Sequence, residues 1–194
     1  HSSAASDVYK RQLLYKLTNI VTIKNKKTLN TVIIIPARID SSRLKKKLLR
    51  NISGLPMIVR VAQNAENLKM GRVIVGTDSR EIYNECEKNN LEAMMTKSSH
   101  KSGTDRVYEV YKILNKDFDL IINLQGDLPI FKKDLLEKTT KLFSDDSVDI
   151  GSAVCDLEDS EINDNNIVKA RVVLDDYDCL LYTSDAADEG LRVV

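Results

Sequence analysis

Thr31–Leu49, TVIIIPARIDSSRLKKKLL, joins an apolar segment to a basic, hydroxyl-rich loop. The run Val32–Ile35 predicts a short buried β-strand, because β-branched residues favour strands. We expect Pro36 to end this strand, since proline has no N–H to contribute to a sheet. Open α/β sheets bind ligands beyond the carboxyl ends of their strands. A loop rich in arginine, serine and lysine at that place therefore predicts a site for a nucleotide triphosphate.

Segments typical of strands and helices alternate along the rest of the chain. Further strands are expected at 72–76, 91–96, 120–124, 150–154 and 167–174, and helices at 56–67, 78–89, 103–114 and 133–143. This alternation predicts one α/β domain, with a mostly parallel twisted sheet and helices on both faces. The strand at 120–124 is apolar enough to be buried on both of its faces.

The composition argues against a protein that binds nucleic acid or spans a membrane. The chain has 29 basic and 29 acidic residues, so its formal net charge is zero. No apolar run approaches the about 20 residues that a membrane span needs. Apart from Cys179, the cysteines are Cys86 and Cys155, and their spacing is not that of a metal site. This cysteine usage predicts a reducing compartment, and we expect a cytoplasmic protein.

The charged side chains of the first loop suit a polyphosphate. Arginine offers a planar fork to two phosphate oxygens, and lysine offers a mobile point charge. The hydroxyls of Ser41 and Ser42 and nearby backbone N–H groups can add fixed dipoles. Arg38, Arg43 and Lys47 are spaced so that a curled loop brings all three to one polyphosphate. The alternative is a solvated connection, because a strand followed by a basic loop is a weak signal when taken alone.

A second candidate site is Asn123–Pro129, NLQGDLP, which follows the strand expected at 120–124. Gly126 allows the backbone to pass close to a ligand or to take a positive φ. Asp127 can hold Mg²⁺ against phosphate oxygens, because Mg²⁺ commonly takes only one or two protein carboxylates. Gln125 suits a base edge or a sugar hydroxyl. A simple turn is the alternative reading of the Gly-Asp pair.

A third segment, Met95–Arg106, is dense in small hydroxyl residues and precedes an expected helix. Thr104 or Ser102 can cap this helix, and Asp105 in its first turn favours the helix dipole. Capping accounts for Asp105 without any ligand. His100 lies in the loop, and we assign it no role as a base.

Five blocks of sequence together resemble the 3-deoxy-D-manno-octulosonate (Kdo) cytidylyltransferases, or CMP-Kdo synthetases. These blocks are IIPARIDSSRLKKKLL, SGLPMI, VGTD, MTKSSHKSGTDR and INLQGDLP, and the resemblance covers about residues 31–174. It implies a Rossmann-like nucleotidyltransferase fold of the glycosyltransferase-A type. It also implies that CTP and Kdo react, with Mg²⁺, to give CMP-Kdo and pyrophosphate for lipopolysaccharide biosynthesis in Gram-negative bacteria. The full-length form is expected to be a homodimer with no nucleic-acid or membrane partner.

The resemblance implies roles for particular residues, most of them in loops that follow expected strands. The implied CTP-binding residues are Pro36, Ala37, Arg38, Ser42, Arg43, Lys47, Thr96, Lys97, Gln125 and Gly126. The implied catalytic residues are Arg43, Lys47 and Asp127. Arg43 and Lys47 would neutralise charge on the leaving pyrophosphate, and Asp127 would be the metal ligand.

The chain departs from the pattern of the family at several positions. The family's loop usually reads RLPGKPL, and Lys45, Lys46 and Leu48 stand in place of its proline, glycine and second proline. The added charge suits a polyphosphate but changes what shapes the loop. Lys97 stands where an arginine is usual, and Leu128 stands where an acidic residue is common.

The two ends of the chain resemble translated adapter DNA. Ser2–Gln12 and Cys179–Glu189 can be encoded by the two strands of one DNA segment, as in a transposase adapter for sequencing libraries. The alternative is a natural flexible tail at each end. We therefore expect residues 1–12 and 179–194 to be foreign. Residues 13–30 are then either a native extension or translated upstream sequence.

The expected nucleotidyltransferase domain, residues 31–178, is incomplete at its C-terminus if the end of the chain is foreign. Nothing after Asp178 matches the family's second metal-binding aspartate and most of its sugar pocket, so we expect the 194-residue chain to be impaired as an enzyme. Three alternatives stay open: a cytidylyltransferase for another acidic sugar, a CTP-binding remnant without activity, and a purely structural α/β domain. Sialic-acid-type relatives usually carry a glycine-rich loop, which IDSSRL does not resemble.

Overall fold

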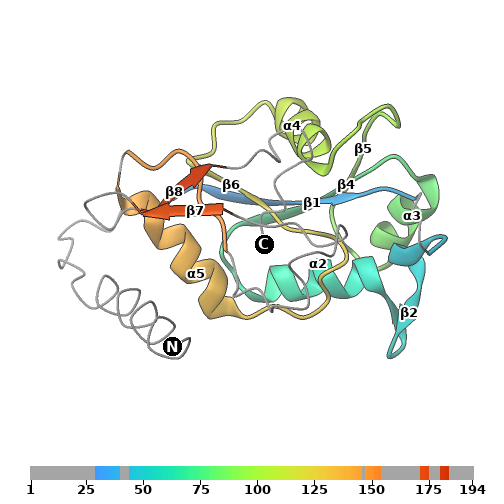
Figure 1. Cartoon of the computed structure of the whole chain (residues 1–194). Helices are drawn as coiled ribbons and strands as arrows, with labels where there is room; N and C mark the ends of the chain where they lie inside the picture. Colours follow the sequence, from blue (N-terminus) through green and yellow to red (C-terminus); the bar gives the residue numbers. More distant parts are fainter. Residues whose placement is uncertain (1–28, 40–43, 146, 154–170, 175–179, 184–194) are drawn as a thin grey trace.

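The computed structural model describes residues 29–39, 44–145, 147–153, 171–174 and 180–183, and only the backbone in the last two ranges. Within these residues a parallel sheet lies between two layers of helices (Figure 1). The predicted fold class, an α/β domain with helices on both faces of a parallel sheet, is confirmed.

The main sheet has four parallel strands in the order β5-β4-β1-β6. They are β1 (Thr31–Ala37), β4 (Arg72–Thr77), β5 (Ala93–Met95) and β6 (Leu120–Asn123). Because all four run in the same direction, their carboxyl ends meet at one edge of the sheet. This edge is where the predicted site residues belong.

The apolar run of β1 forms the centre of the core. Val32, Ile33, Ile34 and Ile35 are completely buried. Their side chains alternate between the two faces of the sheet, so a continuous apolar run is what a strand covered on both sides requires. In the register of the sheet, Ile33 lies beside Val73 of β4 and beside Ile122 of β6.

Helices cover the two faces of the sheet unequally. α2 (Met57–Asn67), α3 (Arg80–Lys88) and α5 (Lys133–Lys141) pack on the face that Ile33 and Ile35 enter. α4 (Gly103–Leu114) lies on the opposite face (Figure 1) and packs its buried apolar residues against Val32, Ile34 and Ile74.

Short elements connect this framework. A 3₁₀ turn (Lys47–Leu49) follows the first loop and leads into a small hairpin of β2 (Asn51–Ile52) and β3 (Leu55–Pro56). This hairpin delays the start of the helix predicted at 56–67 by one residue. A second 3₁₀ turn, Leu142–Ser144, ends the segment predicted as helix 133–143.

Two predictions about strands are wrong in detail. Residues 150–153 form no strand, and Val154 lies outside the described residues. In addition, β6 is not buried on both faces, because it lies at the edge of the described sheet and Ile121 stays 38% exposed.

The strand predicted at 167–174 is described only from Arg171 to Leu174, as β7. It pairs antiparallel with β8 (Leu180–Thr183) in a separate sheet, so β7 does not extend the main sheet. β8 falls in the range 179–194, for which we expect a foreign origin. Among the described residues, no helix combines the length and the apolar character needed to cross a bilayer.

Candidate active site

Those predicted site residues that the structure describes gather at the carboxyl edge of the main sheet. Ala37 ends β1, and Thr96 follows the last residue of β5. Gln125 and Gly126 follow the end of β6. Ligands of open α/β sheets bind at this edge, so the fold brings together residues from Ala37 to Gly126 that are far apart in the printed sequence.

Pro36 lies inside β1 and does not end it, which corrects our prediction. The strand continues to Ala37, and Pro36 pairs in register with Gly76 of β4. The carbonyl of Ile34 accepts a hydrogen bond from Leu124 N, just past β6. Residues two apart on a parallel strand face the same neighbour, so Pro36 faces the place where β6 has ended. A missing N–H costs nothing at that place.

Gly126 lies in a tightly packed part of the turn after β6. A Cβ at this residue would lie 3.2 Å from the Pro36 carbonyl oxygen and 3.3 Å from Cδ1 of Ile58. The turn is closed by a hydrogen bond from Leu128 N to the Gln125 carbonyl, at 3.2 Å. The glycine thus brings Gln125 and Asp127 against the end of β1.

The first loop and the turn after β6 meet through an ion pair. Lys47 Nζ lies 2.7 Å from Asp127 Oδ2, with the two side chains 36% and 46% exposed. Burial of the adjacent Leu48 anchors this end of the loop. Two of the three implied catalytic residues are therefore in contact. Ser42 and Arg43 lie outside the described residues, and Arg38 is exposed at the start of the loop.

Lys46 has a left-handed backbone, with φ 51° and ψ 38°. This is the position at which the resembled family usually has glycine, the residue that adopts this region without steric cost. The Lys46 ammonium binds both carboxylate oxygens of Glu81 on α3, at 2.7 and 2.8 Å. The loop therefore keeps a turn that suits glycine, and the side chain of Lys46 contacts the neighbouring helix α3.

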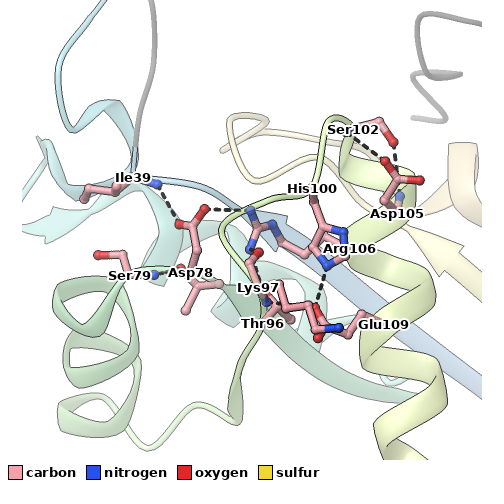
Figure 2. Close-up of polar contacts among 11 residues, drawn as sticks. Ile39, Asp78, Ser79, Thr96, Lys97, His100, Ser102, Asp105, Arg106 and Glu109 are labelled. Carbon is pink, nitrogen blue, oxygen red and sulfur yellow. Dashed lines mark hydrogen bonds and ion pairs between the residues drawn. The ribbon is translucent and has the colours of Figure 1, made fainter.

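Behind this edge lies a buried polar network that our sequence reasoning missed (Figure 2). Arg106 of α4 donates from Nη2 to Asp78 Oδ2 at 2.7 Å and from Nη1 to the Thr96 hydroxyl. Asp78 Oδ1 accepts a hydrogen bond from Ile39 N at 3.2 Å. The side chains of Arg106 and Asp78 are only 4% and 11% exposed. A signal existed in the sequence, because Arg106 lies four residues before Val110 on the apolar face of its helix.

Glu109, one turn along α4, holds the loop after β5. Its Oε2 accepts from Lys97 N at 2.9 Å and lies 2.5 Å from His100 Nε2 (Figure 2). Burial raises the pKa of Glu109, but the hydrogen bonds from His100 and Lys97 lower it by more, so the carboxyl pKa lies below its usual value. The Lys97 backbone is thereby fixed, while its side chain stays exposed.

The start of α4 confirms one of the two caps that we expected. The Ser102 hydroxyl accepts from Asp105 N at 3.1 Å, and Ser102 N donates to Asp105 Oδ2 at 3.1 Å. This capping box fixes the helix start and leaves Thr104 without a capping role. The same contacts lower the pKa of the Asp105 carboxyl.

Asp127 fits a magnesium ion that arrives with a nucleotide. Among the described residues, no group of three or more histidine, cysteine or acidic side chains can hold a metal by itself. Mg²⁺ is commonly held by one or two carboxylates and by substrate phosphates, so one exposed carboxylate at this edge suffices for such an ion. In the described part of the chain, Oδ1 of Asn123 at the end of β6 is buried and has no hydrogen-bond partner.

Comparison with known proteins identifies close relatives of the chain. The model of the family described as "Cytidylyltransferase" matches residues 32–186. The 3-deoxy-manno-octulosonate cytidylyltransferase of Neisseria meningitidis serogroup C is 40% identical over 163 residues, which are 83% of this chain and 64% of the relative. The protein of that name from Nitrobacter hamburgensis is 41% identical over 72% of this chain and 55% of its own length. The chain thus spans less than two thirds of these curated relatives.

Solved structures agree with this comparison. A CMP:2-keto-3-deoxy-manno-octonic acid synthetase complexed with CTP is 36% identical, with a TM-score of 0.57, over 61% of this chain and 49% of that chain. A cytidylyltransferase from Leptospira borgpetersenii matches with a TM-score of 0.51 and 22% identity, over 60% of this chain and 49% of its own. The second match supports the fold alone.

Proposed function

Because the chain belongs to the cytidylyltransferase family, we propose that the protein transfers CMP from CTP to Kdo and releases pyrophosphate. The observation that carries the proposal is the identity of about 40% to curated relatives named for this activity. The product would serve lipopolysaccharide biosynthesis. The compartment that we propose is the cytoplasm, in accord with the buried, free thiol of Cys86.

The triphosphate of CTP is proposed to bind over the first loop. Lys47 is held at this edge by Asp127, within reach of the carboxyl end of β1. Arg38 lies at the start of the loop with its side chain exposed. Together with Arg43, these cations would neutralise the phosphates and the leaving pyrophosphate, which is the main electrostatic demand of nucleotidyl transfer.

The cytidine and sugar parts are proposed to lie along the loops after β5 and β6. Thr96 is buried and hydrogen-bonded to Arg106, so it forms a rigid wall. Gln125 is half-buried, and its amide has both donor and acceptor groups for a base or a hydroxyl. Gly126 keeps this wall close to β1, where Pro36 and Ala37 line the floor.

Asp127 would hold Mg²⁺, which in this reaction supplies Lewis-acid stabilisation of phosphate charge. Lys47 and Asp127 form an ion pair in this structure, and we propose that binding of CTP separates the two side chains. The chain's own part in the reaction is then positioning. The loop cations fix the triphosphate so that the anomeric hydroxyl of Kdo attacks the α-phosphorus opposite to the leaving pyrophosphate.

Release of pyrophosphate from CTP and Kdo tests the proposal. We expect Asp127→Ala to lower kcat/KM by at least about 100-fold, the scale seen when an electrostatic catalytic group is removed. Asp134→Ala, which removes an exposed carboxylate on α5, is the matched control and should leave turnover unchanged. Equal turnover in both variants would refute the role of Asp127.

The activity assay needs a longer version of the protein beside the 194-residue chain. Because the chain spans less than two thirds of its curated relatives, the assay should pair it with a version extended by the C-terminal part of the Neisseria meningitidis relative. CTP binding measured by calorimetry separates loss of catalysis from loss of the site. A panel of acidic sugars in place of Kdo tests the acceptor, and sedimentation of the extended protein tests the homodimer that we propose.

A further inference from the structure

We infer that Arg106 and Asp78 are positioning residues, which hold the loops after β1, β4 and β5 in one arrangement from behind the site. This inference rests on the proposed function. Neither residue is among those that the family resemblance implies for the site. Arg106 is buried, and the side chain of Asp78, which binds it, is only 11% exposed (Figure 2).

The Arg106 guanidinium connects the loops after β4 and β5. Its Nη2 donates to Asp78, the residue after β4. Its Nη1 donates to the Thr96 hydroxyl and, at 3.3 Å, to the Lys97 carbonyl, just after β5. Two loops therefore meet on one planar group, whose geometry fixes the angle between them.

Asp78 also binds the loop after β1, so it connects that loop to Arg106. One carboxylate oxygen binds Arg106 and the other accepts from Ile39 N. Ile39 follows Arg38 and leads into the segment proposed to bind the triphosphate. The position of Ile39 at the start of that segment therefore depends on Arg106, through the Asp78 carboxylate that binds both groups.

The packing of α4 on the sheet lets Arg106 reach these loops. A Cβ at Gly76 would lie 2.6 Å from Cγ2 of Val110 and 3.5 Å from Cγ of Arg106. The glycine thus allows the helix to approach β4 closely. A lysine in place of Arg106 would keep the charge, but its single ammonium cannot reproduce the fork that binds Asp78 and Thr96 together.

A positioning role explains why the pair is ionic. Buried ion pairs are a weak source of stability, because desolvation offsets much of their attraction. They do fix geometry, since each partner is costly to leave unpaired. An apolar pair would fill the same space, but it would leave the Ile39 N–H and the Thr96 hydroxyl without their present partners.

The test compares Arg106→Lys and Asp78→Asn with Arg72→Lys. Arg72 is a matched control because it forms a two-pronged ion pair with Glu92 at the opposite, amino end of the same strand, β4. Hydrogen exchange at the Ile39 and Lys97 amides reports on the loops without any nucleotide. Steady-state kinetics on the extended protein report on CTP and Kdo separately.

We expect both positioning variants to speed exchange at Ile39 and to raise the KM for CTP about tenfold, as loss of a charge-assisted hydrogen bond predicts. The KM for Kdo and the exchange of core amides in β1 should stay nearly unchanged. Arg72→Lys should change neither loop exchange nor KM. A merely structural role would lower the active fraction, and hence the apparent kcat, with both KM values unchanged.

Unchanged exchange at Ile39 in both positioning variants would overturn the inference, as would equal effects in Arg72→Lys. Failure of the unsubstituted extended protein to bind CTP would instead overturn the proposed function. In that case the exchange data still decide whether Arg106 holds the loops. Arg106→Lys and Asp78→Asn are conservative, so a folded sample of at least one keeps the test decisive.

Discussion

At several positions, packing against distant segments explains which residue type the backbone accommodates. Pro36 is tolerated inside β1 because β6 ends beside it. Glycine suits position 126 because the turn after β6 lies close to the Pro36 carbonyl. Lys46 takes a left-handed backbone and contacts Glu81 with its side chain. The residue types were visible in the sequence, whereas the constraints on them came from the packing of distant segments.

Lys46 offers a test of how this loop replaces a glycine turn. Lys46→Gly removes backbone strain of about 1 kcal/mol but also removes an exposed ion pair and frees the unfolded chain. We expect the free energy of unfolding to change by less than about 1 kcal/mol. Lys138→Gly is the control, because that lysine also pairs with a carboxylate but lies inside α5.

The control should lose about 1 kcal/mol, the usual cost of glycine within a helix. Urea unfolding at one pH measures both variants. Equal losses at the two lysines would show that the left-handed turn at Lys46 carries no strain.

Cys86 predicts a pH dependence of stability. Burial, with a smaller contribution from Glu85, raises the pKa of the Cys86 thiol from 9.0 to about 12. The folded state then holds this proton where the unfolded state has lost it. The thiol's contribution to stability is present below about pH 9 and is lost progressively as the pH rises toward 12.

Cys86→Ala isolates this effect. Between about pH 9 and pH 10, we expect the unsubstituted protein to lose about 1 kcal/mol more unfolding free energy than the variant. Chemical unfolding at several pH values measures the difference in slope. Parallel slopes for the two proteins would contradict the raised pKa.

Among the helices, α4 both covers one face of the sheet and contacts the loops of the proposed site. α4 begins at a capping box, covers one face with Val107 and Val110, and presents Arg106 and Glu109 to the loops at the carboxyl edge. The helix bounds were predictable from apolar spacing and capping residues. Its polar contacts were not, because the partners Asp78 and Lys97 belong to other elements.

Gly76→Ala tests the close approach of α4 to β4. Its new Cβ would meet Val110 at 2.6 Å, a distance that forces the helix away from the strand. We expect a loss of about 1–3 kcal/mol in unfolding free energy, the usual cost of overpacking. Thermal or urea unfolding gives this value directly.

Val110→Ala supplies the matching second substitution. It removes the atom that the new Cβ would meet, so the double variant should be more stable than the sum of the two single changes predicts. A purely additive result would show that the contact between Gly76 and Val110 does not limit the approach of α4.

In the described part of the molecule, the residues that form the core are separate from those proposed to form the site. Ile34 is completely buried between the sheet and α4, whereas the ion pair of Lys47 and Asp127 is exposed. The core lies along the strands, and the polar groups lie beyond their carboxyl ends. Stability and activity should therefore respond to different substitutions.

Ile34→Ala and Asp127→Asn test this separation. We expect Ile34→Ala to cost about 2–5 kcal/mol of unfolding free energy, because it leaves a cavity in the core. Asp127→Asn should change that free energy by less than about 1 kcal/mol, since it breaks an exposed pair. It should still lower turnover in the extended protein. A large stability loss in Asp127→Asn would show that the pair is structural.

Short stretches of the sequence were enough to predict the main strands and helices. The apolar run of β1, the helix spacing at 103–114 and the block NLQGDLP each carry their information within a few residues. They led to the parallel fold and to the edge of the sheet at which we propose the site. Other features depend on residues that are far apart in the chain. They are the edge position of β6, the contact between Lys47 and Asp127, and the contact of Arg106 with Asp78. Such contacts exist only after the strands pair and α4 packs, because no local pattern specifies which distant groups will share one hydrogen-bonding atom.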